Sequence, residues 1–248
     1  MLMRLKAWRD SRRKQLSIIP FLMTFANACL GLASVVYALN NQFITSAYCI
    51  ILAVLFDGMD GKLARIFGSS SSLGMELDSL CDAVSFCFAP AIVLYSWSLS
   101  SRHWIGLLAV GLYLCLGLFR LAKFNMIGNG DKVFFIGLPT TAAAAWIASL
   151  VIASPWLEAS HWKCIITPYG LSLIVGILAI LMISTVRFPS FKSRKEIPPI
   201  WLLIPSAAIC AGLCALIVKI PFCLTLISSY IFSSIIINAV FLIRKYRR

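Results

Sequence analysis

Residues 57–82 read DGMDGKLARIFGSSSSLGMELDSLCD, a polar and acidic stretch between two long apolar segments. The chain of 248 residues has nine acidic side chains, and five of them fall in this stretch: Asp57, Asp60, Glu76, Asp78 and Asp82. Carboxylates inside membrane-like sequence are costly unless a metal ion, a counter-charge or a water-filled cavity compensates them. Four aspartates at helical spacings therefore predict a functional site.

The rest of the chain has the composition of a membrane protein. It is 60% hydrophobic and 12% charged, whereas soluble domains have about 25% charged residues. A run of about 20 apolar residues is long enough to cross a bilayer as a helix. We expect an all-α polytopic membrane bundle with about eight transmembrane helices, at residues 17–39, 43–66, 73–99, 104–125, 135–153, 168–186, 199–218 and 222–243.

The cations are distributed unevenly across the predicted membrane. With the N-terminus inside, 19 of the 22 lysines and arginines fall on the inner side, and only Arg102, Lys163 and Lys219 fall outside. This is the positive-inside pattern, so the net charge of +13 reflects topology and not nucleic-acid binding. We expect both termini and the acidic site to be cytoplasmic, in a membrane of the bacterial inner-membrane type.

One membrane domain, residues 17–243, lies between a basic segment at 1–16 and a basic tail at 244–248. In the first segment Leu2, Leu5 and Trp8 recur at helical spacing among cations, which suits a helix lying on the membrane surface. A plain cytoplasmic tail explains the same residues equally well.

The aspartates form two pairs on two neighbouring predicted helices. Asp57 and Asp60 share one face of the second span, and Asp78 and Asp82, four residues apart, share one face of the third. The short connection makes these helices antiparallel neighbours, so both acidic faces converge near the inner surface. Carboxylates without histidine or thiolate suit hard cations, Mg²⁺ or Mn²⁺, and two such ions can clamp a phosphoryl group.

Residues between the two pairs suit an anionic ligand. Gly61 and Ala64 leave space for close approach to the backbone, Arg65 offers a forked donor for phosphate, and the serine turn at 68–72 precedes a helix N-terminus, which attracts anions. Taken singly, Arg65 also suits a structural ion pair, and Gly61 and Gly74 suit close helix packing. A divalent-cation transporter explains acidic residues in spans, but not the arginine and serines beside them.

The full pattern, D-x2-DG-x2-AR-x8-G-x3-D-x3-D, resembles the signature of the CDP-alcohol phosphatidyltransferase family at every position. These enzymes move a phosphatidyl-type group from a CDP-linked donor to an alcohol and release CMP. The resemblance implies that Asp57, Asp60, Asp78 and Asp82 bind metal and that Asp82 is also the general base. The residues expected to bind the CDP donor are Thr24, Asn27, Gly61, Ala64, Arg65, Ser71 and Gly74.

Three further segments resemble the branch of this family that uses L-serine as the acceptor. They are IPFLMTFANACLG at 19–31, RLAKFN at 120–125 with FIGLPTTAAA at 135–144, and MISTVRFPSFK at 182–192. Phe21 and Thr141 depart from the asparagine and proline usual in that branch. The expected acceptor-binding residues are Arg120, Lys123, Asn125 and Arg187. Topogenic anchoring explains each of the three cations equally well, but not Asn125.

The resemblance implies an enzyme that transfers phosphatidyl from CDP-diacylglycerol to L-serine, within a homodimer. Attack by the serine hydroxyl would give phosphatidylserine and CMP. Glycerol 3-phosphate, inositol or choline are the alternative acceptors, because the aspartate motif is shared across the family and does not specify the acceptor.

Overall fold

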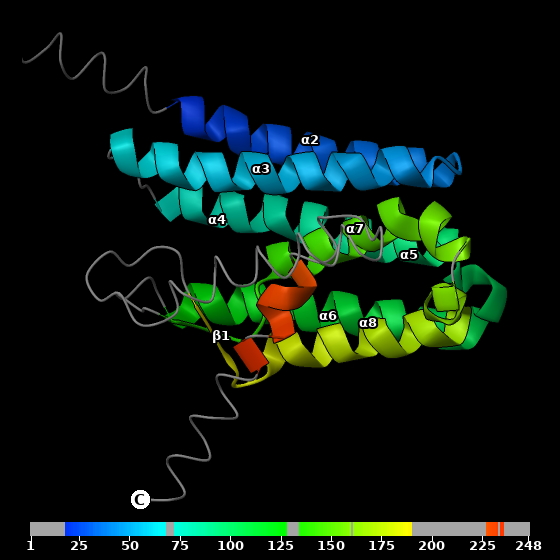
Figure 1. Ribbon diagram of the computed structural model, residues 1–248. Helices are drawn as coiled ribbons and strands as arrows, with labels where there is room; N and C mark the ends of the chain where they lie inside the picture. Colours follow the sequence, from blue (N-terminus) through cyan, green and yellow to red (C-terminus); the bar gives the residue numbers. More distant parts are fainter. Residues whose placement is uncertain are drawn as a thin grey trace, which may run out of the picture.

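The computed structural model describes residues 18–67, 72–127, 134–159, 161–189, 227–232 and 234–235, and these are almost entirely helical (Figure 1). The long helices are α2 (Ile18–Leu39), α3 (Phe43–Phe67), α4 (Ser72–Asp82), α5 (Ala89–Trp97), α6 (His103–Ile127), α7 (Thr140–Glu158) and α8 (Pro168–Ile183). A π-helical segment, η1 (Ala83–Phe88), joins α4 to α5, and two 3₁₀ segments, η2 (Leu99–Arg102) and η3 (His161–Ile166), complete the connections.

Five of the described helical stretches are long and apolar enough to cross a membrane. They are Phe21–Leu39, Phe43–Asp60, Leu73–Trp97, Trp104–Met126 and Thr140–Glu158, which confirms the first five predicted spans as apolar helices. The sixth corresponds to α8, an apolar helix of 16 residues. Residues 227–232 and 234–235 of the eighth are helical. The seventh span, the segment at 1–16 and the tail at 244–248 lie outside the described residues.

A short antiparallel ladder is the exception to the all-α prediction. Strand β1 (Phe134–Ile136) pairs with β2 (Arg187–Pro189), with Ile136 opposite Arg187. The fifth predicted span therefore begins later, at Thr140, because Gly137 has a positive φ of 81° and Pro139 precedes the first helical turn. The amides of Gly137 and Leu138 donate to the carbonyls of Val186 and Leu181, at 2.8 and 3.0 Å. These bonds fix the start of α7 against the end of α8.

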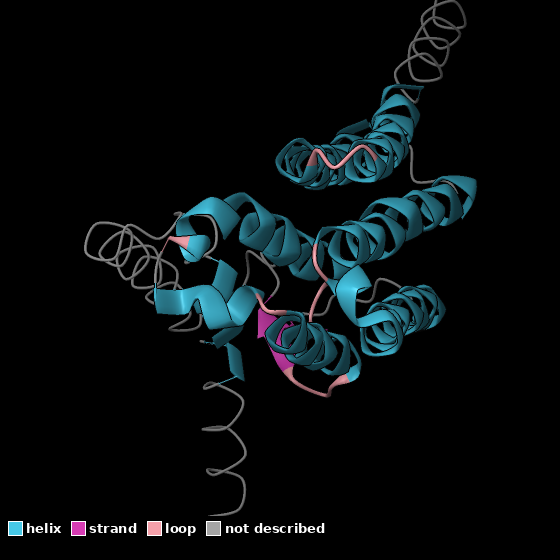
Figure 2. Ribbon diagram, turned by 90° about the vertical axis from the view of Figure 1, so that its right-hand side faces the viewer, coloured by secondary structure: helices cyan, strands magenta, loops and turns pink. Residues whose placement is uncertain are grey.

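Helix α7 lies at the centre of the bundle. Figures 1 and 2 show α2 and α3 side by side on one flank and α6 with α8 on the other. Small side chains let α7 pack closely, and Ala143, Ala144 and Ala148 are all fully buried. The flanking helices instead expose large apolar side chains, such as Leu32 (61%) and Leu108 (67%), as expected for surfaces that face lipid.

The π-helical segment η1 follows directly after Asp82. The Tyr113 hydroxyl donates to the Phe86 carbonyl of this segment at 2.9 Å, and the Ser85 hydroxyl donates to the Asn27 carbonyl of α2 at 2.9 Å. Segments of π-helix are rare, occur mostly as single turns within α-helices, and are frequent at functional sites. The sequence predicted one uninterrupted helix here, so the π-helical turn is an addition from the structure.

Gly31 gives a test of the contact between α2 and η1. A Cβ at this position would lie 2.5 Å from Ser85 Oγ and 2.8 Å from Ser85 Cα. We expect Gly31→Ala to lower the free energy of unfolding by about 1–3 kcal/mol through overpacking, measured by thermal unfolding in detergent. Gly111→Ala is the matched control, because nothing lies within 4 Å of its added Cβ. Equal melting temperatures of the two variants would contradict this close contact.

Candidate active site

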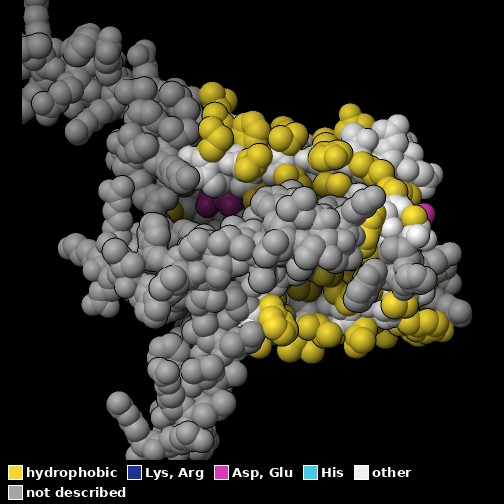
Figure 3. Space-filling model, viewed as in Figure 1, with side chains coloured by type: hydrophobic (Ala, Val, Ile, Leu, Met, Phe, Trp, Pro, Cys, Tyr) yellow, Lys and Arg dark blue, Asp and Glu magenta, His cyan; other side chains and the backbone are white. Residues whose placement is uncertain are grey.

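Three of the four predicted aspartates meet at one point between α3 and α4. Asp57 and Asp60 come from the end of α3 and Asp78 from α4, and one carboxylate oxygen of each lies within 4.8 Å of the other two. Asp60 is only 4% exposed. Figure 3 shows acidic side chains recessed beneath the surface of the described helices. The convergence predicted from helical spacing is therefore confirmed.

These three carboxylates fit a divalent cation. Buried charges of one sign are costly unless an opposite charge or several hydrogen bonds compensate them. Asp78 Oδ1 is buried and has no hydrogen-bond partner among the described residues. An all-oxygen donor set is the one that Mg²⁺ and Mn²⁺ prefer. The cluster therefore has the chemistry of a site for a hard metal ion.

Helix α2 holds two of the carboxylates from the side. Thr24 Oγ1 donates to Asp60 Oδ2 at 3.2 Å, and Asn27 Nδ2 donates to Asp82 Oδ1 at 3.1 Å. Asn27 is fully buried and Asp82 is half-buried, so this bond is largely shielded from water. Both α2 residues were predicted to bind the CDP donor, and their contacts with the aspartates were not foreseen. Their spacing of three residues, which places them on one helix face, was the available signal.

Asp82 stands next to the group of three rather than within it. It lies one turn along α4 from Asp78, where it interacts electrostatically with Asp57, Asp60 and Asp78. The Oδ1 atom of Asp82 accepts the hydrogen bond from Asn27. This position, beside the three clustered carboxylates and with one oxygen bonded to an amide, suits a group that accepts or donates a proton. Its expected role as a fourth metal ligand stays a prediction.

The remaining predicted donor residues follow the cluster along the chain. Gly61, Ala64 and Arg65 continue α3, which ends at Phe67, and Gly74 lies in the first turn of α4. The side chains of residues 61–72 and the whole of Ser71 lie outside the described part of the structure. Their roles toward a CDP group stay predictions.

Two of the four predicted acceptor residues contact the elements around the cluster. Arg120 Nη1 donates to Thr140 Oγ1 at 3.3 Å, and the guanidinium interacts electrostatically with Asp82. Asn125 Nδ2 donates to Ser79 Oγ at 2.8 Å, which joins α6 to α4. Thr140 was not predicted, although its place after Pro139 at the start of a helix made it a candidate.

The other two predicted acceptor residues are less informative. Lys123 is exposed, and no hydrogen bond or ion pair joins it to any described residue. Arg187 pairs through its backbone with Ile136 in the ladder, which puts it at the end of the bundle where α7 begins, while its side chain lies outside the described residues. Both assignments stay predictions.

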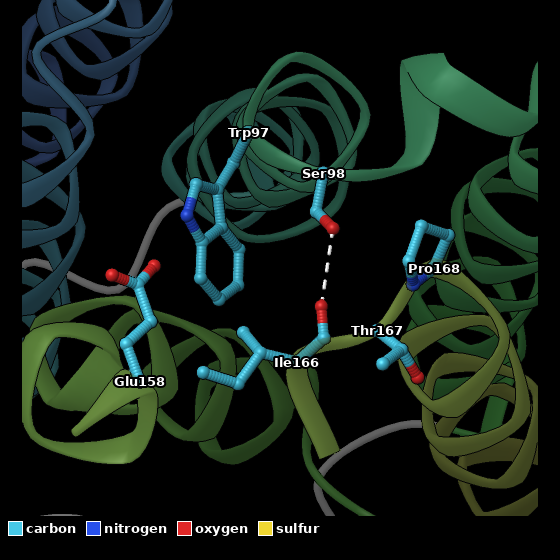
Figure 4. A pocket seen from close by; sticks show the side chains of 6 residues that line it. All are labelled: Trp97, Ser98, Glu158, Ile166, Thr167 and Pro168. Atoms are coloured by element: carbon cyan, nitrogen blue, oxygen red, sulfur yellow. Dashed lines mark hydrogen bonds between the residues drawn. The ribbon is translucent and has the colours of Figure 1, made fainter. Parts of the chain in front are cut away.

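A cavity of about 400 Å³ lies at the other end of the bundle (Figure 4). Its lining residues are Trp97, Ser98, Glu158, Ile166, Thr167 and Pro168. Glu158 ends α7, whereas Thr140, which contacts Arg120, begins it. The length of α7 separates this cavity from the aspartates, so it is not part of the same site.

Comparison with known proteins agrees with this geometry. The family model of the CDP-alcohol phosphatidyltransferases matches residues 17–171. A Helicobacter pylori protein named CDP-diacylglycerol–serine O-phosphatidyltransferase is 34% identical over 184 residues, 73% of this chain and 75% of its own.

Two further relatives come from distant organisms. A Bacillus subtilis protein with the same name is 32% identical over 181 residues, 72% of this chain and 94% of its own. An archaetidylserine synthase of Methanothermobacter thermautotrophicus is 32% identical over 182 residues, 73% of each chain. The chain therefore belongs to the CDP-alcohol phosphatidyltransferase family.

Proposed function

We propose that the protein transfers the phosphatidyl group of CDP-diacylglycerol to L-serine and so forms phosphatidylserine and CMP. The observation that carries this proposal is the convergence of Asp57, Asp60 and Asp78, with Asp82 beside them, in a chain whose relatives are named for this reaction. Arg120 lies near Asp82, the proposed base, and supplies a cation for an acceptor that carries a carboxylate.

We assign three of the aspartates to the donor and Asp82 to the acceptor. Asp57, Asp60 and Asp78 would hold one or two Mg²⁺ or Mn²⁺ ions, which when bound neutralise charge on the diphosphate of the donor. The residues expected to contact the CDP group are Gly61, Ala64, Arg65, Ser71 and Gly74. Thr24 holds Asp60 in place through its hydroxyl, and thereby fixes the geometry of the cluster.

Asp82 is the proposed acceptor of the proton from the serine hydroxyl. Asn27 occupies Oδ1, which leaves Oδ2 to take the proton from the serine hydroxyl. The serine oxygen then forms a bond to the phosphorus that carries diacylglycerol, and the bond from that phosphorus to the CMP oxygen breaks. CMP leaves with the electron pair, and positive charge near its phosphate stabilises it.

Serine is favoured over the other acceptors by the charge around Asp82. A guanidinium binds a carboxylate through two parallel hydrogen bonds, and Arg120 keeps a buried Nε without a partner among the described residues. Choline carries no anionic group for this arginine, and inositol is uncharged. Glycerol 3-phosphate is also anionic, and serine is favoured over it because the relatives are named for transfer to serine.

Orientation and assembly belong to the same proposal. The excess of cations on one side of the predicted spans supports cytoplasmic termini and a cytoplasmic site, where serine and CMP are soluble. We expect a homodimer formed through the membrane helices, measurable as the mass of the detergent-solubilised particle by light scattering. A monomeric mass at full activity would contradict it.

An acceptor screen tests the activity. With CDP-diacylglycerol and Mn²⁺ or Mg²⁺, purified protein is expected to release CMP when L-serine is added and to stop when a chelator removes the metal. Sealed inverted membrane vesicles should show the same activity with added serine without permeabilisation, because the site faces the cytoplasm. Release that requires inositol or glycerol 3-phosphate would contradict the serine assignment, and no release with any alcohol would contradict the enzyme assignment.

A further inference from the structure

The described part of the C-terminal region packs against the helices that carry the proposed acceptor residues. Residues 227–232 and 234–235 are helical (orange to red in Figure 1). Ile231 is buried in the core cluster, and Trp146 of α7 donates from Nε1 to Ser228 Oγ at 2.8 Å. This C-terminal helix lies beyond residue 171, where the family match ends.

Arg120 has donor capacity that the described residues do not use. Its Nη1 donates to Thr140 Oγ1, whose residue is 2% exposed, while its Nε is buried and has no hydrogen-bond partner among the described residues. An unsatisfied buried N–H costs free energy. An arginine with one edge held and one N–H unused is therefore suited to receive an acceptor oxygen from a ligand.

Tyr230 of the C-terminal helix lies beside this arginine. Arg120 and Tyr230 lie close enough for each to affect the ionisation of the other, and Asp82 lies close enough to Arg120 to affect its ionisation. The phenol oxygen accepts hydrogen bonds, which a phenyl ring does not. The arginine is thus enclosed by three elements: its own helix α6, the start of α7 at Thr140, and the C-terminal helix at Tyr230.

We propose that Tyr230 is a positioning residue for the acceptor: its hydroxyl orients the Arg120 guanidinium so that the unused N–H faces the carboxylate of the incoming amino acid. The C-terminal helix is then the third wall of the acceptor subsite, outside the part of the chain that matches the family. This inference rests on the proposed function, because it takes the acceptor to be an amino acid.

Anchoring of the C-terminal helix is independent of the Tyr230 hydroxyl. Ile231 in the core and the bond from Trp146 to Ser228 hold this segment in place. Removal of the hydroxyl alone should therefore leave the helix docked. A change in the KM for L-serine alone would therefore indicate positioning of the acceptor and not a structural role.

The test is Tyr230→Phe in the full-length protein in detergent micelles. We expect the KM for L-serine to rise about three- to tenfold, the effect of one lost hydrogen bond near a charged group, with kcat and the KM for CDP-diacylglycerol changed less than about twofold. Inhibition by L-alanine, which has the carboxylate and ammonium but no hydroxyl, should weaken by the same factor. Inhibition by L-alaninamide, which has no carboxylate, should be the same in both proteins.

Ser228→Ala is the matched control on the same helix. It removes the bond to Trp146, so we expect a lower melting temperature and an unchanged ratio of the two KM values. The inference is overturned if Tyr230→Phe leaves the serine KM unchanged, raises both KM values alike, or lowers only the melting temperature. Failure of the proposed function would instead show in the wild type, as no serine-dependent CMP release.

Discussion

Replacing Asp82 by asparagine is expected to lower turnover by about 10²- to 10⁴-fold, the range that a positioned general base contributes. Asparagine has nearly the same shape, and its side-chain oxygen still accepts from Asn27 Nδ2, which bonds Asp82 Oδ1 at 3.1 Å in the structure. The change therefore removes the proton acceptor with little change in packing. The measurement is the rate of serine-dependent CMP release at saturating substrates.

Binding of the donor gives the control for this variant. The three clustered aspartates remain, so CDP-diacylglycerol with metal should still raise the melting temperature of Asp82→Asn as it does for the wild type. Glu76→Gln, at an exposed position of the same helix, should keep full turnover. An Asp82→Asn protein with near-normal turnover would exclude Asp82 as the base.

Replacing Asp78 by asparagine should reverse the effect of metal on stability. In the absence of divalent ions we expect this variant to melt at a higher temperature than the wild type, because it carries one fewer charge among carboxylates that lie within 4.8 Å of one another. With metal at about 100 times its dissociation constant, the wild type gains about 2.7 kcal/mol. The variant should gain much less and should release no CMP.

The measurement is the melting temperature of the wild type and of Asp78→Asn, each with and without Mn²⁺. Glu76→Gln again serves as the control, because it removes an acidic side chain from α4 outside the cluster and should keep the full metal effect. A variant Asp78→Asn that retains the whole Mn²⁺-dependent rise in melting temperature would show that Asp78 is not a ligand.

The convergence of the aspartates could be predicted because it depends on local geometry. Spacings of three and four residues place side chains on one helix face, and the short connection between Phe67 and Ser72 forces α3 and α4 to be neighbours. The five spans followed from apolar length alone. These parts of the fold need no knowledge of how distant segments pack.

Contacts between distant elements could not be predicted in the same way. The bonds from Thr24 and Asn27 to the aspartates join residues 36 and 55 positions apart, and nothing in the pattern of α2 specifies which neighbour it faces. The ladder forms because the chain turns back between α7 and α8, which brings β2, after α8, beside β1, before α7. Tyr230 was missed because the segment at 222–243 has no charged residue, so nothing in its pattern pointed to the acidic site.

The π-helical turn after Asp82 has a consequence for insertions and deletions during evolution. Hydrogen bonds in a π-helix close one residue further along the chain than in an α-helix, so loss of one residue between Ala83 and Phe88 would let this segment become α-helical with little change in the facing of Asp82 relative to α5. The same deletion in the turn at 40–42, between α2 and α3, leaves the facing of each helix free to adjust. Active relatives are therefore expected to tolerate a one-residue gap between Asp82 and Ala89, as in the turn, but no gap between Asp78 and Asp82, where loss of one residue would turn one aspartate by about 100° relative to the other.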